Sequence, residues 1–205
     1  MLKKLRVFLT EKRILISRIF SVLLFILILI SKDRWEENGF MDLTLAFLGV
    51  ILVSIGMLGR IWVSMYVSGY KSSSLIIEGP YSIVRNPLYF FSFLGAAGIG
   101  MSSGSLLVTS LICVGFILYY PFVIVQEEKQ LAAKHGADFL KYTSVTPRLI
   151  PDPFRYHQPV SYTVAVKQYQ KSFVDAGMFI LIYAFVQLLE RLHESGVLPV
   201  YLRIP

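Results

Sequence analysis

Long runs of apolar residues alternate with short polar segments along the whole chain. The runs without charge, or with one charged residue each (Arg60 and Asp175), cover 19–30, 43–70, 86–126 and 173–189. A helix over 43–70 would be about 42 Å long, and a bilayer core is about 30 Å thick, so this run can span it. The uncharged run at 86–126 is too long for one span and is the right length for two. The pattern predicts five transmembrane helices. Arg60 then lies near one end of the second helix, where we expect it to snorkel to the membrane surface; the alternative is a cation that faces a polar cavity.

Small and hydroxyl-bearing residues at 98–105 divide the long central run. They predict a tight turn between two antiparallel helices, packed closely through the small residues at 95–98. The second of these helices continues past the apolar region through Glu127 and Glu128, and we expect it to end at Gly136, a typical residue at a helix C-terminus.

The first apolar run also has the character of a signal peptide, because several lysines and arginines precede it. No small-x-small cleavage site follows Ile30. A polar loop that contains Trp35 follows instead. We therefore expect an uncleaved membrane anchor.

Composition restricts the class of protein. The chain is 55% hydrophobic and 16% charged, whereas about a quarter of the residues of a typical soluble domain are charged, so the composition argues against a soluble enzyme. The net charge of +7 would suit nucleic acid or an anionic membrane surface. The mean hydropathy of +0.63 favours the membrane as the partner, with no nucleic acid.

The positions of Lys and Arg predict an orientation. With five spans, 15 of the 20 basic residues fall on one side of the membrane, which should be cytoplasmic. The N-terminus and the polar segments 71–87 and 126–172 then face the cytoplasm, in an inner (cytoplasmic) membrane. Cys113 is the single cysteine, and His135, His157 and His193 lack metal-ligand spacing, so we expect no disulfide and no metal.

Two polar clusters on this face are candidates for chemistry. The first, at 78–89, reads Glu-Gly-Pro-Tyr-Ser-Ile-Val-Arg-Asn-Pro-Leu-Tyr. Asn86 and Pro87 are typical N-cap and first-turn residues, so a helix should begin there, and its free N–H groups beside Arg85 would suit an anion. The simpler interpretation is a capped helix with an interfacial arginine.

The second cluster is the pair Glu127 and Glu128 near the end of a long helix, followed by Tyr142, Arg148 and Pro151. Carboxylates near a helix C-terminus are mildly unfavourable, so a cation should lie close to them. A solvated helix end would have the same sequence.

Taken together, the two clusters are similar to the isoprenylcysteine carboxyl methyltransferase and phospholipid methyltransferase family of integral-membrane enzymes. The shared pattern is Gly-Pro-Tyr-x3-Arg-Asn-Pro-x-Tyr, a glycine-rich hairpin, Glu-Glu-x2-Leu-x4-Gly-x3-Leu-x-Tyr and Arg-x2-Pro, over roughly 75–151. The resemblance implies methyl transfer from S-adenosylmethionine by in-line displacement at the cytoplasmic face. The acceptor would be a lipid-like or small hydrophobic molecule that enters from the bilayer.

The same resemblance implies site residues. The cofactor would be bound by Gly79, Pro80, Tyr81, Arg85, Asn86, Pro87, Tyr89, Glu127, Glu128, Tyr142 and Arg148. Arg85 and the helix start would hold its carboxylate, and Glu127 or Glu128 its ammonium or ribose hydroxyls. Tyr81, Tyr89 and Tyr142 would line the adenine or sulfonium pocket. Glu127, Glu128 and Arg85 are the catalytic candidates, and either glutamate could be the base for an amine or hydroxyl acceptor.

Two positions depart from the family pattern. Asn86 stands where His is more usual, which fits a capping role. Val123 stands where the prenylcysteine enzymes generally carry Arg, which argues against a prenylcysteine acceptor. The sequence leaves carboxylate, phosphate, amine and thiol acceptors open.

Two other functions stay open on the sequence. Membrane NADPH-dependent reductases of the sterol type look similar around Gly-Pro-Tyr and Arg-x-Pro-x-Tyr, but a dinucleotide phosphate demands more basic groups. A non-enzymatic scaffold or small transporter would have as many spans, but here the polar residues gather on one face rather than along a midplane path.

The predicted architecture is thus an all-α polytopic membrane protein with about five transmembrane helices, a central helical hairpin and a cytoplasmic cofactor-binding region. We divide it into two N-terminal spans (1–70), a methyltransferase core (71–151), and a connector, fifth span and tail (152–205).

Overall fold

The computed structural model describes residues 13–33, 39–68 and 74–205. Their α-helices are α2 (Arg13–Ile30), α3 (Gly39–Val67), α4 (Pro80–Ile83), α5 (Pro87–Met101), α6 (Leu106–Val145) and α7 (Val166–Glu194). A 3-10 helix, η1 (Pro153–Arg155), and two short strands, β1 (Ser31–Asp33) and β2 (Leu202–Ile204), complete the described elements. The fold is mostly helical, as the sequence predicts. The basic residues before Arg13, the loop at 34–38 and Lys71 lie outside the described residues.

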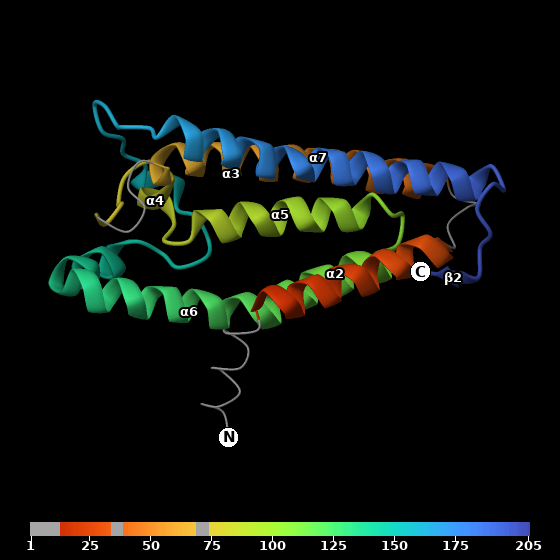
Figure 1. Cartoon of the computed structure of the whole chain (residues 1–205), viewed down its shortest axis with the longest axis horizontal. Helices are drawn as coiled ribbons and strands as arrows, with labels where there is room; N and C mark the ends of the chain where they lie inside the picture. The colour runs from red at the N-terminus through yellow and green to blue at the C-terminus, as the bar shows by residue number, and fades with distance from the viewer. Residues whose placement is uncertain (1–12, 34–38, 69–73) are drawn as a thin grey trace, which may run out of the picture.

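The long helices lie side by side along one axis (Figure 1). α7 runs along α3 on one side, α5 lies in the middle, and α6 and α2 lie on the other side. The two strands join distant parts of the chain at one end of the bundle, where β1 and β2 pair in parallel and Ser31 lies opposite Leu202. The sequence did not predict this strand pair.

Glycines allow α3 and α5 to pack against each other closely. A Cβ on Gly56 would lie 2.7 Å from the Cα of Gly95, and a Cβ on Gly98 would lie 2.6 Å from the carbonyl oxygen of Gly49. Close backbone contact of this kind is how helices associate in a membrane, where no hydrophobic effect drives them together. The expectation that the small residues at 95–98 join α5 to α6 is therefore wrong for Gly95 and Gly98, because their faces point to α3 and α7.

The central hairpin itself is confirmed. α5 ends at Met101 and α6 begins at Leu106, and the turn between them contains Gly104 at a φ of 64°. The hydroxyl of Ser105 accepts a hydrogen bond from the backbone N–H of Val108 (3.2 Å) and so caps α6.

Gly136 interrupts α6 without ending it. Its φ of 51° and ψ of −120° are not helical, yet helical residues continue to Val145. The prediction of a helix end at Gly136 thus identified the break but not the second helical segment, which carries Tyr142 to the site.

Three helices, α3, α6 and α7, are long and apolar enough to cross a membrane. α5 and the apolar part of α2 (Ser17–Ile30) are shorter. α5 is about 22 Å long at 1.5 Å per residue, below the thickness of a bilayer core. The fold is that of an integral membrane protein, and five spans stay a prediction.

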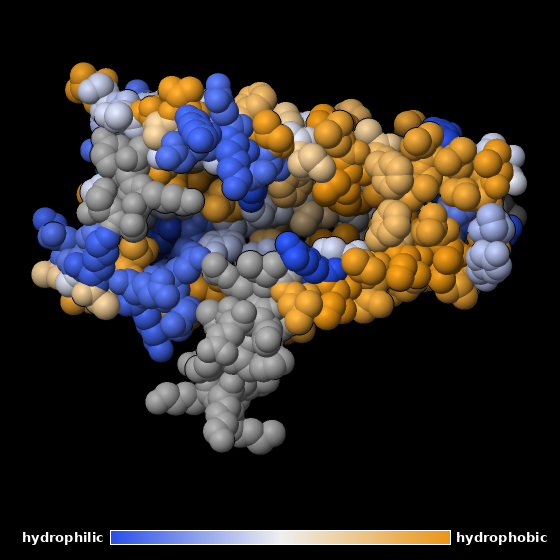
Figure 2. Space-filling model, viewed as in Figure 1, coloured by the Kyte–Doolittle hydropathy of each residue, from blue (hydrophilic) through white to orange (hydrophobic). Residues whose placement is uncertain are grey.

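Polar surface gathers at one end of the molecule. Figure 2 shows hydrophilic side chains mainly around the end where α4 and the last turns of α6 lie, and hydrophobic ones over the middle and the opposite end. Backbone hydrogen bonds tie this polar end together: Arg85 N–H donates to the Pro147 carbonyl (2.8 Å), and Asp152 N–H to the Ile83 carbonyl (2.9 Å). The cytoplasmic orientation of this end and the three-part division of the chain stay predictions.

Candidate functional site

The carboxylate of Glu128 joins three segments at the polar end. Its oxygens lie 3.3 Å from Nη1 of Arg85 and 2.7 Å from Nη2 of Arg148. Glu128 is only 8% exposed, so charged partners are needed to offset its removal from water. Two guanidinium groups around one carboxylate leave the cluster with an excess of one positive charge.

Asn86 completes this cluster and overturns its predicted capping role. Its side-chain amide donates to Glu128 Oε1 (3.2 Å) and to the carbonyl of Arg148 (3.1 Å), and it makes no capping bond to α5. The helix does begin as predicted, with Pro87 in its first turn. Asn86 therefore connects the start of α5 to the segment after α6.

Arg85 is held from its backbone and its side chain at once. Its N–H is bonded to Pro147, one guanidinium nitrogen faces Glu128, and its buried Nε has no hydrogen-bond partner within 13–33, 39–68 and 74–205. A buried donor without a partner costs free energy, so a further acceptor group would stabilise this arginine.

Glu127 faces a different environment from its neighbour. Its Oε1 accepts a hydrogen bond of 2.7 Å from the Tyr89 hydroxyl, and its side chain is half-buried. The Tyr89 ring packs against Tyr120 with 5.2 Å between ring centroids. The paired glutamates predicted as one site thus have separate partners.

Glu127 and Tyr89 line a cavity of about 700 Å³ between α2, α5 and α6. Its other lining residues come from α2 and α6: Ser17, Arg18, Ser21, Val22, Tyr119, Tyr120 and Val123. Volumes of 300–1,000 Å³ are usual for small-molecule sites. A second cavity of about 510 Å³ lies at the polar end, where Arg85 and residues 143–147 and 150–155 line it.

Arg18, Tyr119 and Tyr120 were missed in the sequence. Arg18 was assigned to the membrane anchor, and the two tyrosines to an apolar span. One signal was present, since Tyr120, Val123 and Glu127 lie three and four positions apart and so share one face of a helix. Nothing in the sequence shows that α2 lies against that face.

Tyr81 and Tyr142 join two of the segments that carry the site. The Tyr142 hydroxyl donates to the backbone carbonyl of Tyr81 (2.8 Å), which joins α4 to the last turns of α6. Burial, and to a lesser extent the charge of Glu127, raise the pKa of the Tyr81 phenol, which keeps it neutral. Neither residue lines the two cavities above, so their predicted contact with the cofactor gains no support from this placement.

Gly79 and Pro80 form the turn that begins α4. Gly79 has a φ of 60°, and a Cβ there would lie 2.2 Å from the Tyr66 ring, so glycine is required. Its N–H donates to the His157 carbonyl (2.8 Å). The two residues position the segment that carries Arg85, and their contact with a cofactor stays a prediction.

Arg60 corrects another expectation. The sequence favoured snorkelling to the membrane surface, but its guanidinium points into the bundle. It donates to the Ser92 hydroxyl on α5 and lies 5.3 Å from the centroid of the Phe179 ring on α7. Arg60 therefore joins three helices, in the way that intramembrane charges commonly face the protein interior.

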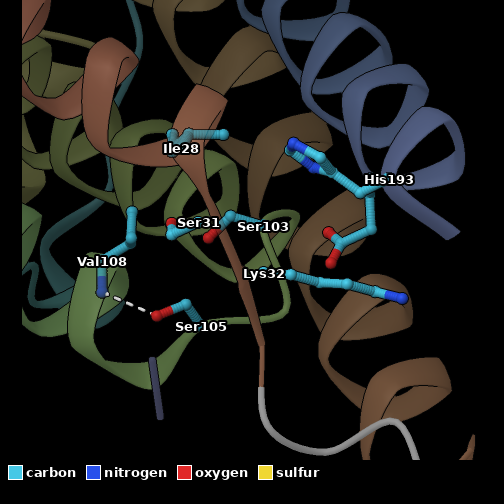
Figure 3. A pocket seen from close by; sticks show the side chains of 8 residues that line it. Ile28, Ser31, Lys32, Ser103, Ser105, Val108 and His193 are labelled. Carbon is cyan, nitrogen blue, oxygen red and sulfur yellow. Dashed lines mark hydrogen bonds between the residues drawn. The ribbon is translucent and has the colours of Figure 1, made fainter. Parts of the chain in front are cut away.

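A third cavity lies at the opposite end of the bundle, beside the strand pair (Figure 3). Lys32, Ser103, Ser105 and His193 are among its lining residues, and its volume is about 10 Å³. This is room for about one water molecule, so it cannot hold a cofactor. Among the described residues, no three His, Cys, Asp or Glu side chains form a group that could hold a metal ion.

Comparison with known proteins identifies the family. A family model described as phospholipid methyltransferase matches residues 40–138, which include Arg85, Tyr89, Glu127 and Glu128. This chain belongs to the phospholipid methyltransferase family. The resemblance seen in the sequence is thereby confirmed, and membership points to a membrane methyltransferase.

Two relatives within bacteria are similar over nearly the whole chain. The cobalt-zinc-cadmium resistance protein CzcN of Cupriavidus metallidurans is 34% identical over 191 residues, which are 93% of this chain and 88% of that protein. The nickel-cobalt-cadmium resistance protein NccN of Alcaligenes xylosoxydans xylosoxydans is 29% identical over 198 residues, 97% of this chain and 92% of that protein. No solved structure matches this member of the phospholipid methyltransferase family.

Proposed function

We propose that this protein transfers a methyl group from S-adenosylmethionine to a lipid-like or membrane-partitioned acceptor. The observation that carries the proposal is the charge arrangement around Glu127 and Glu128. A cluster with one excess positive charge (Arg85, Arg148, Glu128) lies next in sequence to a carboxylate that lines a large cavity.

These groups fit the charges of the cofactor. S-adenosylmethionine carries a carboxylate, an ammonium and a sulfonium, and it supplies an electrophilic methyl group bound to positively charged sulfur. Arg85, whose Nε has a free hydrogen-bonding position within the described residues, and Arg148 would hold the carboxylate. Glu127 would hold the ammonium, and the Tyr89 and Tyr120 rings, which line the same cavity, would be cation–π partners for the sulfonium.

The remaining work of the protein is alignment and exclusion of water. Methyl transfer needs the acceptor atom, the methyl carbon and the sulfur in line, and this positioning can supply most of the rate enhancement. The apolar Val22 and Val123 and the rings of Tyr119 and Tyr120 would keep the rest of the cavity dry. Glu127 is the candidate base for an acceptor that must lose a proton.

Cofactor binding by the purified full chain tests this proposal. S-adenosylhomocysteine should raise the melting temperature, and NADP should not. Arg85→Ala and Glu127→Gln should each weaken S-adenosylhomocysteine binding by about tenfold, the loss expected for one charged hydrogen bond. Asp138→Asn is the matched control, because Asp138 is an exposed carboxylate on the same helix as Glu127. Stabilisation by NADP alone would favour the reductase instead.

Membranes that contain the protein, incubated with methyl-labelled cofactor, identify the class of product. We expect label in the lipid fraction, and less of it with Glu127→Gln than with Asp138→Asn. Label in a volatile fraction would point to a small thiol acceptor, and no label above membranes without the protein would contradict methyl transfer.

We also propose that α2 and α5 cross the bilayer with the three longer helices, and that the polar end is cytoplasmic. Single cysteines at Arg155 and Val197, in a Cys113→Ser background, test this, since both positions are exposed. An impermeant maleimide should label position 155 from the cytoplasmic side and position 197 from the opposite side. Labelling of both from one side would contradict five spans.

The names of the two relatives suggest a physiological setting. CzcN and NccN are named for resistance to divalent metal ions, and we infer that methylation of a membrane molecule by this chain contributes to such resistance. In a cadmium-sensitive bacterium, the wild-type chain and Asp138→Asn should raise the tolerated cadmium concentration, and Glu127→Gln should not. Equal protection by Glu127→Gln would separate resistance from methyl transfer.

A further inference from the structure

The 700 Å³ cavity has a cationic wall that the proposed cofactor site does not use. Arg18, on α2, is one of its lining residues, and its side chain is exposed. Ser21 lies three positions after Arg18 and four after Ser17, so it shares a face of the helix with each of them. Both serines line the same cavity.

Arg18 stands at the start of an apolar helix. The twelve residues that follow it, to Ile30, carry no charge. An arginine next to a membrane span is stabilised where it faces a polar cavity and an anionic partner. Within residues 13–33, 39–68 and 74–205, its guanidinium has no hydrogen bond or ion pair.

The carboxylate in the same cavity is on another helix and has its own partner. Glu127 lies on α6 and accepts the hydrogen bond from Tyr89. The cavity thus has a carboxylate with tyrosine rings on one wall and a cation with two hydroxyls on another. Val22 and Val123 add apolar surface to it. A ligand that matches this lining has an anionic group and an apolar chain.

We propose that Arg18, with Ser17 and Ser21, binds the anionic group of the methyl acceptor, an amphiphile that carries a carboxylate or a phosphate. This inference rests on the proposed function, since it assigns the acceptor of that reaction. The guanidinium can bind either oxyanion through two parallel hydrogen bonds, and the serine hydroxyls can donate to its remaining oxygens. α2 lies outside the residues that match the family model. A binding site on α2 would therefore make the acceptor specific to this chain rather than common to the family.

Equilibrium dialysis of purified full-length protein with three amphiphiles of equal chain length tests the site. The probes are dodecanoate, dodecyl phosphate and uncharged dodecanol. We expect the wild type to bind one of the two anions more tightly than dodecanol, which also separates a carboxylate from a phosphate acceptor. Arg18→Gln should weaken binding of that anion by about tenfold and leave dodecanol unchanged. Arg18→Lys should restore part of the loss, because it keeps the charge without the planar fork.

Lys134→Gln is the control for loss of a positive charge, because Lys134 is exposed on α6 and does not line this cavity. The proposal would be overturned if the Arg18→Gln protein bound both anions as tightly as the Lys134→Gln protein does. S-adenosylhomocysteine melting shifts on the same samples test the proposed function separately. A wild type that lacks this shift but keeps the Arg18-dependent preference would refute methyl transfer and retain the anion site.

A measurement on the wild-type protein tests the site without the need for a variant that folds. Phenylglyoxal modifies accessible arginines, and mass spectrometry locates the modified residue. The anionic probe should protect Arg18, and dodecanol should not. Modification of Arg18 at the same rate with and without the anion would contradict the site.

Discussion

Glu127 and Glu128 are adjacent in the sequence, yet their carboxylates lie in different surroundings in the structure. Glu128 is buried between Arg85 and Arg148, whereas Glu127 is half-buried, bonded to Tyr89 and part of the cavity wall. On a helix, neighbouring side chains point about 100° apart, so one residue can stabilise the fold while the next faces a ligand.

This difference predicts unequal costs for the two glutamine substitutions. Glu128→Gln leaves two guanidinium groups facing each other without a carboxylate, and we expect it to lower the free energy of unfolding by about 2–3 kcal/mol. Glu127→Gln should cost less than about 1 kcal/mol, because its carboxylate is partly solvated. Thermal unfolding in detergent compares them. Equal losses, or a larger loss for Glu127→Gln, would contradict the assignment.

Tyr142→Phe separates a supporting role from a cofactor contact. Removal of the hydroxyl breaks the bond to the Tyr81 carbonyl, and the expected loss of stability is about 1 kcal/mol. Affinity for S-adenosylhomocysteine should stay within about twofold in titrations well below the melting temperature, since Tyr142 does not line the cavities. Tyr201→Phe is the control, because Tyr201 is 73% exposed. A tenfold loss of affinity in Tyr142→Phe alone would return this residue to the cofactor site.

The close contact between α3 and α5 should not tolerate an added methyl group. Gly56→Ala places a Cβ 2.6 Å from the backbone nitrogen of Gly95, and backbone atoms can move away only by separating the helices. We expect a loss of about 1–3 kcal/mol, typical of overpacking. Gly177→Ala on α7 has open space around it and should be neutral or slightly stabilising. Similar melting temperatures for the two variants would disprove this packing.

The packing of α2 against α6 can be tested at Gly115. A Cβ there would lie 2.9 Å from the Phe20 ring, so Gly115→Leu should push α2 away and displace Arg18. We expect the preference for anionic amphiphiles to fall by about tenfold while S-adenosylhomocysteine binding is retained, because Arg85 and Glu128 are held by other contacts. Val114→Leu, at an exposed neighbouring position, should change neither. Retained preference in Gly115→Leu would show that this contact does not position α2.

Local signals in the sequence sufficed for the helices and for the residues of the motifs. Proline at position 87 began α5, glycine and serine residues turned the hairpin, and apolar runs marked α3, α6 and α7. These features depend on backbone conformation and on solvent, which neighbouring residues determine. The order of the motifs also identified the family, which the match over 40–138 confirms.

Other features depended on contacts between distant residues. The roles of Asn86 and Arg60 were misjudged because each side chain bonds to another helix or segment, 42 and 32 positions away in the sequence. The strand pair joins residues 31–33 to residues 202–204. Three residues on each side are too few to give a recognisable strand pattern in the sequence.

The sequence by itself determined that this protein is helical, lies in a membrane and carries the methyltransferase motifs, because apolar runs and motif spacing are local properties. Only the tertiary structure decided which glutamate is buried and which one faces the cavity. It also brought Arg18 of α2 and Glu127 of α6 to the lining of one cavity. Packing of separate helices creates a cavity, and no property of a single helix specifies what it will face.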